Sequence, residues 1–143
     1  MMKEQTLILI KPDAVKKGLT GEILSRFEDK GFKITKLKMI RLSEEDAKRF
    51  YDVHVGKPFF KDLVSFITSG PVIATIIEGE NATETVRRMI GPTNPKDAPK
   101  GTIRGDFATS VTENAIHASD SHESFLREYK VIFGSNQDRF LNE

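Results

Sequence analysis

Short runs of β-forming apolar residues predict three strands. Residues 6–10 (TLILI) form one such run, which should end before Pro12 because proline cannot donate to a strand ladder. Residues 32–40 alternate apolar and polar positions with one slip near Thr35, which indicates a strand with one solvated face and a bulge. The nearly continuous β-branched run at residues 71–79 predicts a strand that is buried on both faces.

Apolar residues at helical spacing predict helices between and after these strands. They recur in this way over residues 20–30, 43–51, 58–69, 81–90 and 125–133. Ser43 with Asp46, and Asn81 with Glu84, read as N-terminal capping pairs for two of these helices. The polar stretch at residues 93–101 (TNPKDAPKG) has no periodicity, so we expect a long loop, and such loops are often functional.

The order of these elements indicates the fold class. It is β-α-β-α-α-β-α-loop-α, with room for one further strand near the C-terminus. This order predicts an α+β sandwich of the ferredoxin-like βαββαβ type, with a mostly antiparallel four-stranded sheet and helices on one face. At 143 residues we expect a single domain that spans residues 1–143.

Composition narrows the chemistry. The chain has no cysteine, which excludes disulfides, thiolate metal sites and a cysteine nucleophile. A net charge of +1 argues against a surface built to hold nucleic acid. The apolar run before Lys11 is too short for a signal peptide, and no run approaches the ~20 residues that cross a bilayer. We therefore expect a soluble, cytoplasmic protein without a membrane partner.

No glycine-rich phosphate cradle is present, since the chain has neither a Walker sequence nor a G-x-G-x-x-G motif. Cationic side chains do occur beside predicted strand ends and loops. Lys11 follows the first strand, Arg87 lies before the long loop, and Arg104 follows that loop in TIRGD. A guanidinium donates two parallel hydrogen bonds to a phosphate, so these residues would form an anion site if they converge in space.

His117 is the candidate nucleophile. Neutral imidazole can attack phosphorus near pH 7, provided that a hydrogen bond from the other ring nitrogen fixes the tautomer. Glu128 or Glu123, both on the final predicted helix, could supply that bond. Ser119, Asp120 or Ser121, which follow the histidine, could cap that helix. The N-terminus of a helix favours anions.

Five segments together resemble the nucleoside diphosphate kinase family. They are IKPD after the first strand, FYDVHVGKPFF in the middle, RRMIGPTNP before the loop, GTIRGDF after it, and NAIHASDS around His117. The resemblance runs over residues 6–133 in the order and spacing of the family. It implies a ping-pong enzyme that moves the γ-phosphate of a nucleoside triphosphate to a nucleoside diphosphate through a phosphohistidine.

The resemblance also implies roles for individual residues. His117 would carry the phosphate, Glu128 would orient its ring, and Ser119 would support either Tyr51 or the phosphate. Phe59 and Val111 would enclose the base. The remaining contacts to phosphates and sugar would come from Lys11, Tyr51, His54, Arg87, Thr93, Arg104 and Asn114.

The same resemblance implies Mg²⁺ bound mainly through the nucleotide phosphates, broad tolerance of base and sugar, and a homohexamer or homotetramer. ATP, GTP and other nucleotides would be the ligands, with no stable nucleic acid partner. Lys100 stands where the family usually has proline, and Glu113 stands where many members have arginine. The first departure affects the loop that supports subunit contacts, so the choice of assembly stays open.

Two other interpretations are considered. A non-catalytic relative that binds nucleotides or protein partners would be favoured by loss of the histidine, lysine or arginines, and none is lost. A ferredoxin-like RNA-binding module would carry exposed aromatic residues on its strands and a basic face. Here the aromatic residues fall mainly on predicted helices and the charge is balanced, so we favour the enzyme.

Overall fold

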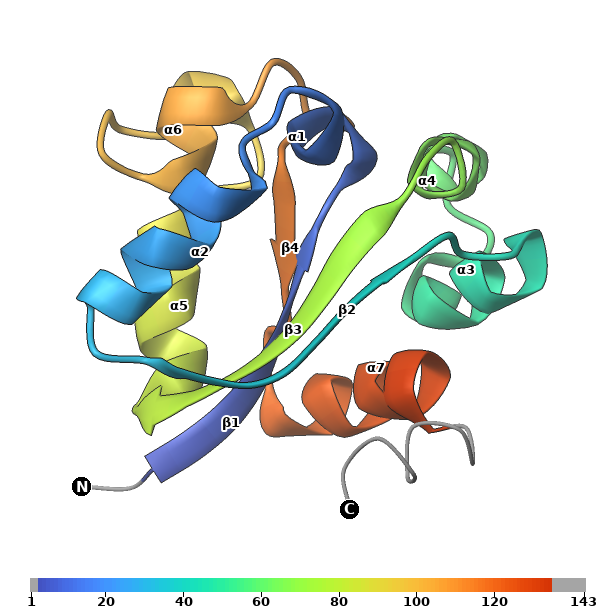
Figure 1. The fold of residues 1–143 in the computed structure, drawn as a ribbon. Coiled ribbons are helices and arrows are strands. Elements are labelled where there is room, and N and C mark those ends of the chain that lie inside the picture. Colours follow the sequence, from blue (N-terminus) through green and yellow to red (C-terminus); the bar gives the residue numbers. More distant parts are fainter. Residues whose placement is uncertain (1–2, 135–143) are drawn as a thin grey trace.

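The computed structural model describes residues 3–134, so most of the C-terminal segment, which the sequence suggests to be peripheral, lies outside the described residues. The strands are β1 (Lys3–Ile10), β2 (Lys33–Ile40), β3 (Val72–Glu80) and β4 (Ile116–Ala118) (Figure 1). The α-helices are α1 (Pro12–Lys16), α2 (Thr20–Asp29), α3 (Glu44–Phe50), α4 (Phe60–Ile67), α5 (Ala82–Ile90), α6 (Ile103–Phe107) and α7 (His122–Phe133). Two 3₁₀ turns, η1 (Asp52–His54) and η2 (Pro95–Asp97), lie in the connections.

The four strands form one antiparallel sheet in the order β2-β3-β1-β4. This is the ferredoxin-like arrangement that the sequence predicts. The slip near Thr35 is a real irregularity, because the register of β2 on β3 shifts between Ile34 and Lys36.

β4 pairs with β1 over three residues and sets His117 opposite Leu9, so the candidate nucleophile is on a strand of the sheet.

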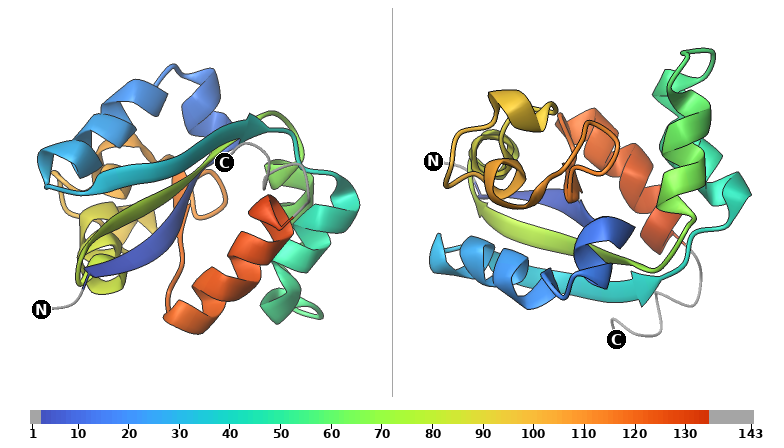
Figure 2. Two further views of the ribbon diagram at one scale, coloured as in Figure 1. Left: turned by 60° about the horizontal axis from the view of Figure 1, so that its bottom comes forward. Right: turned by 90° about the horizontal axis from the view of Figure 1, so that it is seen from above.

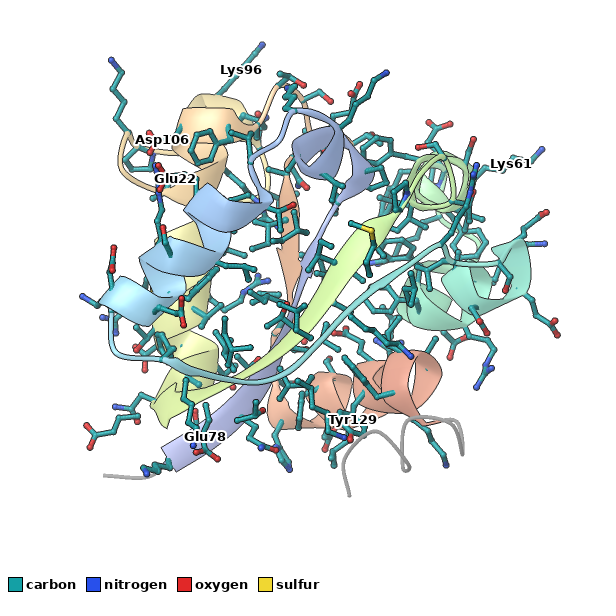
Figure 3. The ribbon with its side chains drawn as sticks, in the orientation of Figure 1. Glu22, Lys61, Glu78, Lys96, Asp106 and Tyr129 are labelled. Atoms are coloured by element: carbon teal, nitrogen blue, oxygen red, sulfur yellow. The ribbon has the colours of Figure 1, made fainter. Side chains whose placement is uncertain are left out.

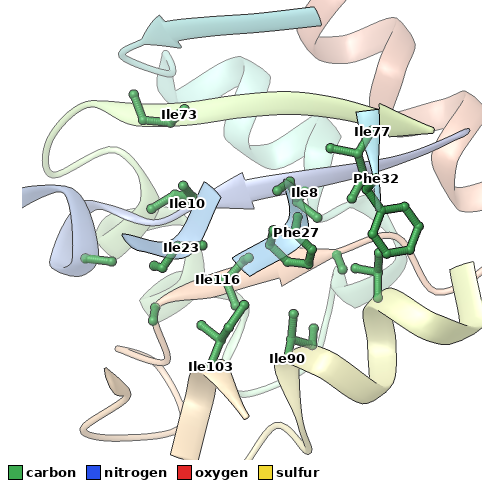
Figure 4. Packing of buried hydrophobic residues seen from close by; sticks show 14 of the residues in the cluster. Ile8, Ile10, Ile23, Phe27, Phe32, Ile73, Ile77, Ile90, Ile103 and Ile116 are labelled. Carbon is green, nitrogen blue, oxygen red and sulfur yellow. The ribbon is translucent and has the colours of Figure 1, made fainter. Parts of the chain in front are cut away.

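Helices cover both faces of the sheet, so the expectation of helices on one face is wrong. Figure 1 and Figure 2 show α2, α5 and α6 on one side and α3, α4 and α7 on the other. Successive side chains of a strand point to opposite faces. Accordingly Ile8 and Ile10 of β1 belong to one buried cluster, which Figure 4 shows, while Leu7 and Leu9 belong to a second. A strand that is apolar at every position needs a cover on each face.

The two predicted helix caps have different outcomes. Ser43 precedes α3 and its hydroxyl accepts a hydrogen bond from the Asp46 backbone N–H at 3.1 Å, as expected. Asn81 precedes α5 but makes no side-chain cap, so that prediction is wrong. Its backbone is left-handed, with a φ of 50°, and Glu84 instead forms an ion pair with Arg88 one turn along the helix.

The long loop after α5 is fixed at both of its ends. Gly91 ends α5 with a φ of 87°, a conformation that glycine adopts without strain. After the loop, α6 is tied to α2 by Arg26, which pairs with Asp106 at 2.8 Å and with Glu22 at 3.6 Å. Figure 3 labels both acids at this side of the molecule. No helix within residues 3–134 combines the length and apolar character that a membrane span requires.

Candidate active site

A pocket of about 400 Å³ opens at the end of the sheet where β1 and β4 meet the loops. It brings together side chains from the residue that follows β1, the α3–α4 region, α5, the long loop, α6, β4 and the final helix. Those among its lining residues that the sequence predicts are Lys11, Tyr51, His54, Phe59, Arg87, Thr93, Arg104, Val111, Asn114, His117 and Glu128. The distant cations therefore do converge on the histidine, as an anion site requires.

The imidazole of His117 is held by the final helix. Its Nε2 lies 2.9 Å from the Oε1 of Glu128, and the same carboxylate oxygen accepts a hydrogen bond from the Ser119 hydroxyl at 2.7 Å. Burial raises the pKa of Glu128, but the charge and hydrogen bond of His117, the Ser119 hydroxyl and Arg127 outweigh it and lower that pKa. Glu128 is therefore ionised at neutral pH. Glu123, the alternative partner, is exposed.

This contact decides the tautomer of His117. An ionised carboxylate can only accept hydrogen bonds, so the proton of the neutral ring belongs on Nε2. That leaves the lone pair of Nδ1 for attack on an electrophile. The Phe50 ring meets the imidazole edge-on with centroids 4.9 Å apart, which restricts rotation of the ring. The side chain keeps 21% of its surface exposed to the pocket.

Lys11 is a buried lysine close to β4, the strand that carries His117. Its Nζ donates to the Oδ1 of Asn114 at 2.7 Å, and the amide of Asn114 donates in turn to the Thr93 carbonyl at 3.3 Å. Desolvation lowers the pKa of Lys11 to about 7, and repulsion by Arg104 adds to this, while Asp13 opposes it. A bound phosphate would supply the negative charge that favours the protonated form.

The two arginines approach the pocket differently. Arg104 is buried and donates from its two terminal nitrogens to the carbonyls of Gly91 at 2.9 Å and Ile116 at 2.8 Å. Burial and then the charge of Arg87 lower its pKa to about 10, so it remains cationic at neutral pH. Arg87 is exposed and donates to the Ala118 carbonyl at 3.2 Å. Two cations this close favour an anion between them.

The mouth of the pocket is apolar. Phe59 and Val111 remain 44% and 51% exposed, which is high for large apolar side chains. The ring of His54 meets the ring of Phe59 edge-on, with the two centroids 5.2 Å apart. Tyr51 is buried below, and burial raises the pKa of its hydroxyl, which therefore stays protonated.

Sequence reasoning missed several lining residues. Arg127 lines the pocket and donates from one guanidinium nitrogen to the Phe50 carbonyl at 2.8 Å, which joins α7 to the end of α3. Asp120 also lines the pocket and accepts from the hydroxyl of Ser124 at 2.6 Å. The position of Arg127 beside Glu128 was the available signal. Ser121, rather than Ser119, caps α7.

The part of the chain that the structure describes offers no complete metal cage. Within residues 3–134 no group of three or more His, Asp or Glu side chains is arranged to hold a metal ion. Carboxylates do reach the pocket through Asp120 and Glu128, but the latter is engaged by His117. Asp120 is thus the carboxylate of the pocket that could contact a cation brought by a phosphorylated ligand.

Comparison with known proteins agrees with this chemistry. The family model described as nucleoside diphosphate kinase matches residues 4–137. A protein of that name from Hyperthermus butylicus is 59% identical over 137 residues, which cover 96% of this chain and 96% of the relative. One from Staphylothermus marinus is also 59% identical over 137 residues, covering 96% of this chain and 97% of the relative.

Solved structures give the same result. The Aquifex aeolicus nucleoside diphosphate kinase matches with a TM-score of 0.90 and 48% identity over 96% of this chain and 99% of that one. The Halobacterium salinarum enzyme in complex with CDP also matches with a TM-score of 0.90, at 44% identity over 94% of this chain and 90% of that one. This chain therefore belongs to the nucleoside diphosphate kinase family and is an enzyme that transfers phosphate between nucleotides.

Proposed function

We propose that His117 carries the phosphate in two successive transfers. The Nδ1 lone pair attacks the γ-phosphorus of a nucleoside triphosphate, a P–N bond forms, and the bond to the β-phosphate oxygen breaks. The diphosphate then leaves. A terminal oxygen of an acceptor diphosphate attacks the same phosphorus, the P–N bond breaks, and neutral imidazole is restored. The convergence of His117 with Lys11, Arg87 and Arg104 in one pocket carries this proposal.

Glu128 orients the ring and stabilises it during both transfers. Its ionised carboxylate holds the Nε2 proton in place at 2.9 Å and offsets the positive charge that the ring acquires when Nδ1 bonds to phosphorus. Ser119 fixes the carboxylate and does not itself reach the pocket lining. The roles of Glu128 and Ser119 are therefore to position His117.

Lys11, Arg87 and Arg104 hold the phosphates. The transferred group carries its charge on three equatorial oxygens, so fixed cations lower the barrier without chemical participation. Asn114 and Thr93 continue the polar lining toward the sugar, and Tyr51 and His54 complete the wall. We assign Mg²⁺ to the nucleotide phosphates, where it would neutralise charge that these side chains leave uncovered.

Phe59 and Val111 enclose the base. Neither side chain carries a hydrogen-bonding group, and stacking on an aromatic ring is available to every base because each base has a π-face. Tolerance of all common bases follows. Tolerance of ribose and deoxyribose belongs to the same proposal and is tested with matched pairs of diphosphate acceptors.

We also propose self-association as a homohexamer or homotetramer. β2 is an edge strand of the sheet, and its Leu37 and Met39 are 51% and 61% exposed. An edge strand with apolar side chains is a ready surface for pairing with a second copy. Light scattering of the full chain distinguishes six subunits from four, and a monomer would contradict the proposal.

A cytoplasmic location, and the lack of a stable nucleic acid or membrane partner, stay predictions. Fractionation of the source cells tests the location. Gel-shift and vesicle-flotation assays at physiological salt test the two classes of partner, and binding in either assay would contradict the expectation.

The decisive experiment follows the labelled phosphate. The enzyme is incubated with γ-labelled ATP and Mg²⁺, and the label should appear on the protein in a bond that is acid-labile and alkali-stable. Addition of a second diphosphate should chase the label into a new triphosphate. His117→Ala should fold and lose both the label and transfer. If the protein is instead a non-catalytic relative, the unsubstituted chain will not be labelled. His122→Ala, at an exposed position of α7, is the matched control.

A further inference from the structure

A strained turn lies directly before the strand that carries His117. Ala115 has a φ of 74°, in the left-handed region that side chains other than glycine rarely adopt. The Ile116 N–H donates to the Asn114 carbonyl at 2.9 Å and closes a three-residue γ-turn. Such a conformation costs about 1–3 kcal/mol and persists only where the surroundings hold it.

Residues at the start of α1 hold this turn. The Ala115 backbone N–H donates to the Oδ2 of Asp13 at 3.1 Å, and the Ala115 carbonyl accepts from the Lys11 backbone N–H at 2.9 Å. Both polar groups of the strained residue are therefore fixed from a segment about a hundred residues away in the sequence. Of the two bonds, only the one to Asp13 depends on a side chain and can be removed by substitution.

The turn fixes the residues on either side of it. Asn114 precedes Ala115 and accepts the bond from the Lys11 ammonium at 2.7 Å. His117 follows two residues later and pairs with Leu9 in the sheet. A shift at Ala115 would consequently move both a ligand of Lys11 and the nucleophile.

Asp13 is also a buried carboxylate, and the hydrogen bond to the turn does not by itself account for the desolvation cost of a charge at this position. Its side chain is 6% exposed, and its Oδ1 accepts no hydrogen bond from the residues that the structure describes. Burial raises the pKa of Asp13, whereas backbone N–H groups and the charge of Lys11 oppose the rise. An amide oxygen would accept from the Ala115 N–H equally well, so the turn by itself does not require a negative charge at position 13.

The neighbouring lysine supplies a reason for that charge. Desolvation and Arg104 lower the pKa of Lys11 to about 7, and Asp13 is the group that acts in the opposite direction. Lys11 can attract a phosphate only while it is protonated. Without Asp13, a buried lysine beside a buried arginine would lose its proton at a lower pH.

We propose that Asp13 is a positioning residue for phosphate transfer: its acceptor oxygen fixes the strained turn at Ala115, and its negative charge lies in the same buried segment as Lys11, two residues away. This inference rests on the proposed function, because it assumes that His117 carries the phosphate and that Lys11 binds it. The two tasks use different properties of one carboxylate, namely its acceptor oxygen and its charge. Different substitutions can therefore separate them.

The experiment compares three variants with the parent enzyme. Asp13→Asn keeps an acceptor for the Ala115 N–H and removes the charge. Asp13→Ala removes both, and Asp29→Asn removes the same charge from an exposed site at the end of α2. For each protein we would measure the ADP dissociation constant by calorimetry between pH 5.5 and about 8.5, the kcat at saturating substrates, and thermal unfolding.

Asp13→Asn should move the pH dependence of binding. The parent should bind ADP more weakly as the pH rises through about 7, because Lys11 then loses its proton. An opposite charge commonly shifts a pKa by about 1–3 units, and Asp13 is the smallest of the three influences on Lys11, so we expect a shift of about one unit. At pH 8 Asp13→Asn should therefore bind about tenfold more weakly than the parent. At pH 5.5, where Lys11 is protonated in both proteins, affinity and kcat should be close to those of the parent. Asp29→Asn should follow the parent throughout.

Asp13→Ala should lose activity at every pH. Displacement of the nucleophile by about 1 Å can lower a rate about a hundredfold, so kcat should fall even at pH 5.5. A residue of merely structural importance would lower thermal stability and leave the pH dependence of ADP binding in place. Should Asp13→Ala not fold, the nearly isosteric Asp13→Asn still decides the question.

Two results overturn the inference: a pH profile of Asp13→Asn that superposes on the parent, or a folded Asp13→Ala with the kcat of the parent. Labelling of the parent on His117 is established first. Absence of that label refutes the proposed function before any Asp13 variant is compared. A labelled parent with a parent-like Asp13→Asn refutes this inference alone.

Discussion

The inner wall and the outer rim of the pocket differ in both residue type and exposure. The inner wall consists of Lys11, Arg104, Asn114, His117 and Glu128, all but the histidine at most 5% exposed. The outer rim consists of His54, Phe59 and Val111, and the latter two are 44% and 51% exposed. Charged groups are thus buried and apolar groups are exposed, which reverses the usual distribution.

The reversal matches the two parts of a nucleotide. Phosphates are the same in every substrate, so the groups that would meet them on the proposed function can be fixed in advance by internal hydrogen bonds, such as those of Arg104 and Lys11. Bases differ, and on the proposed function they would meet Phe59 and Val111, which have no hydrogen-bonding side-chain group. Inner-wall substitutions should therefore affect kcat, whereas rim substitutions should affect KM.

The largest effect is expected from Arg104→Lys. A lysine keeps the charge but cannot reproduce the planar fork that reaches both the Gly91 and Ile116 carbonyls. We expect kcat/KM to fall about a hundredfold to a thousandfold and the free energy of unfolding to fall by about 1–3 kcal/mol. Steady-state kinetics and urea unfolding measure the two quantities. Arg88→Lys, at an exposed position next to Arg87 on α5, is the control. Equal effects of the two substitutions would contradict the difference between the inner wall and the exposed surface.

Glu128→Gln comes next. The amide keeps the shape but removes the charge that holds the Nε2 proton and stabilises the phosphorylated ring. We expect kcat to fall about 10–100-fold with little change in KM, as for other groups that orient a reactive histidine. Glu123→Gln, on the exposed face of the same helix, should behave as the parent. A loss expressed mainly in KM would place Glu128 among the binding residues.

Phe59→Ala should have the smallest effect. Stacking on an aromatic ring contributes about 1–3 kcal/mol per base, and the lower figure applies to a ring this exposed. KM should therefore rise about fivefold to tenfold for all four bases, with kcat nearly unchanged. Val55→Ala, 62% exposed and outside the pocket lining, should leave KM unaltered. A rise restricted to one base would show that the rim discriminates after all.

Much of the fold follows from local patterns. The runs of β1 and β3 and the alternation of β2 predict their strands, and the slip near Thr35 predicts the irregularity of β2. Prediction failed where the pattern was too short or ambiguous. β4 has only three residues, too few for an alternation to be recognised, and Asn81 has a capping residue type but a left-handed backbone. Most residues predicted for the site come from the five motifs, and the structure places them in one pocket. Asp13 and Arg127 were missed because their contacts are to partners distant in sequence.

The sequence by itself determined the types of residue available: one histidine among small neighbours, cations after strand ends, and apolar runs that require burial. Only the tertiary structure decided that Lys11 meets Asn114, that Glu128 rather than Glu123 holds His117, and that both faces of the sheet are covered. The physical reason is that hydrophobic burial and backbone pairing set the register of β1 on β4. That register brings polar groups a hundred residues apart within hydrogen-bond distance.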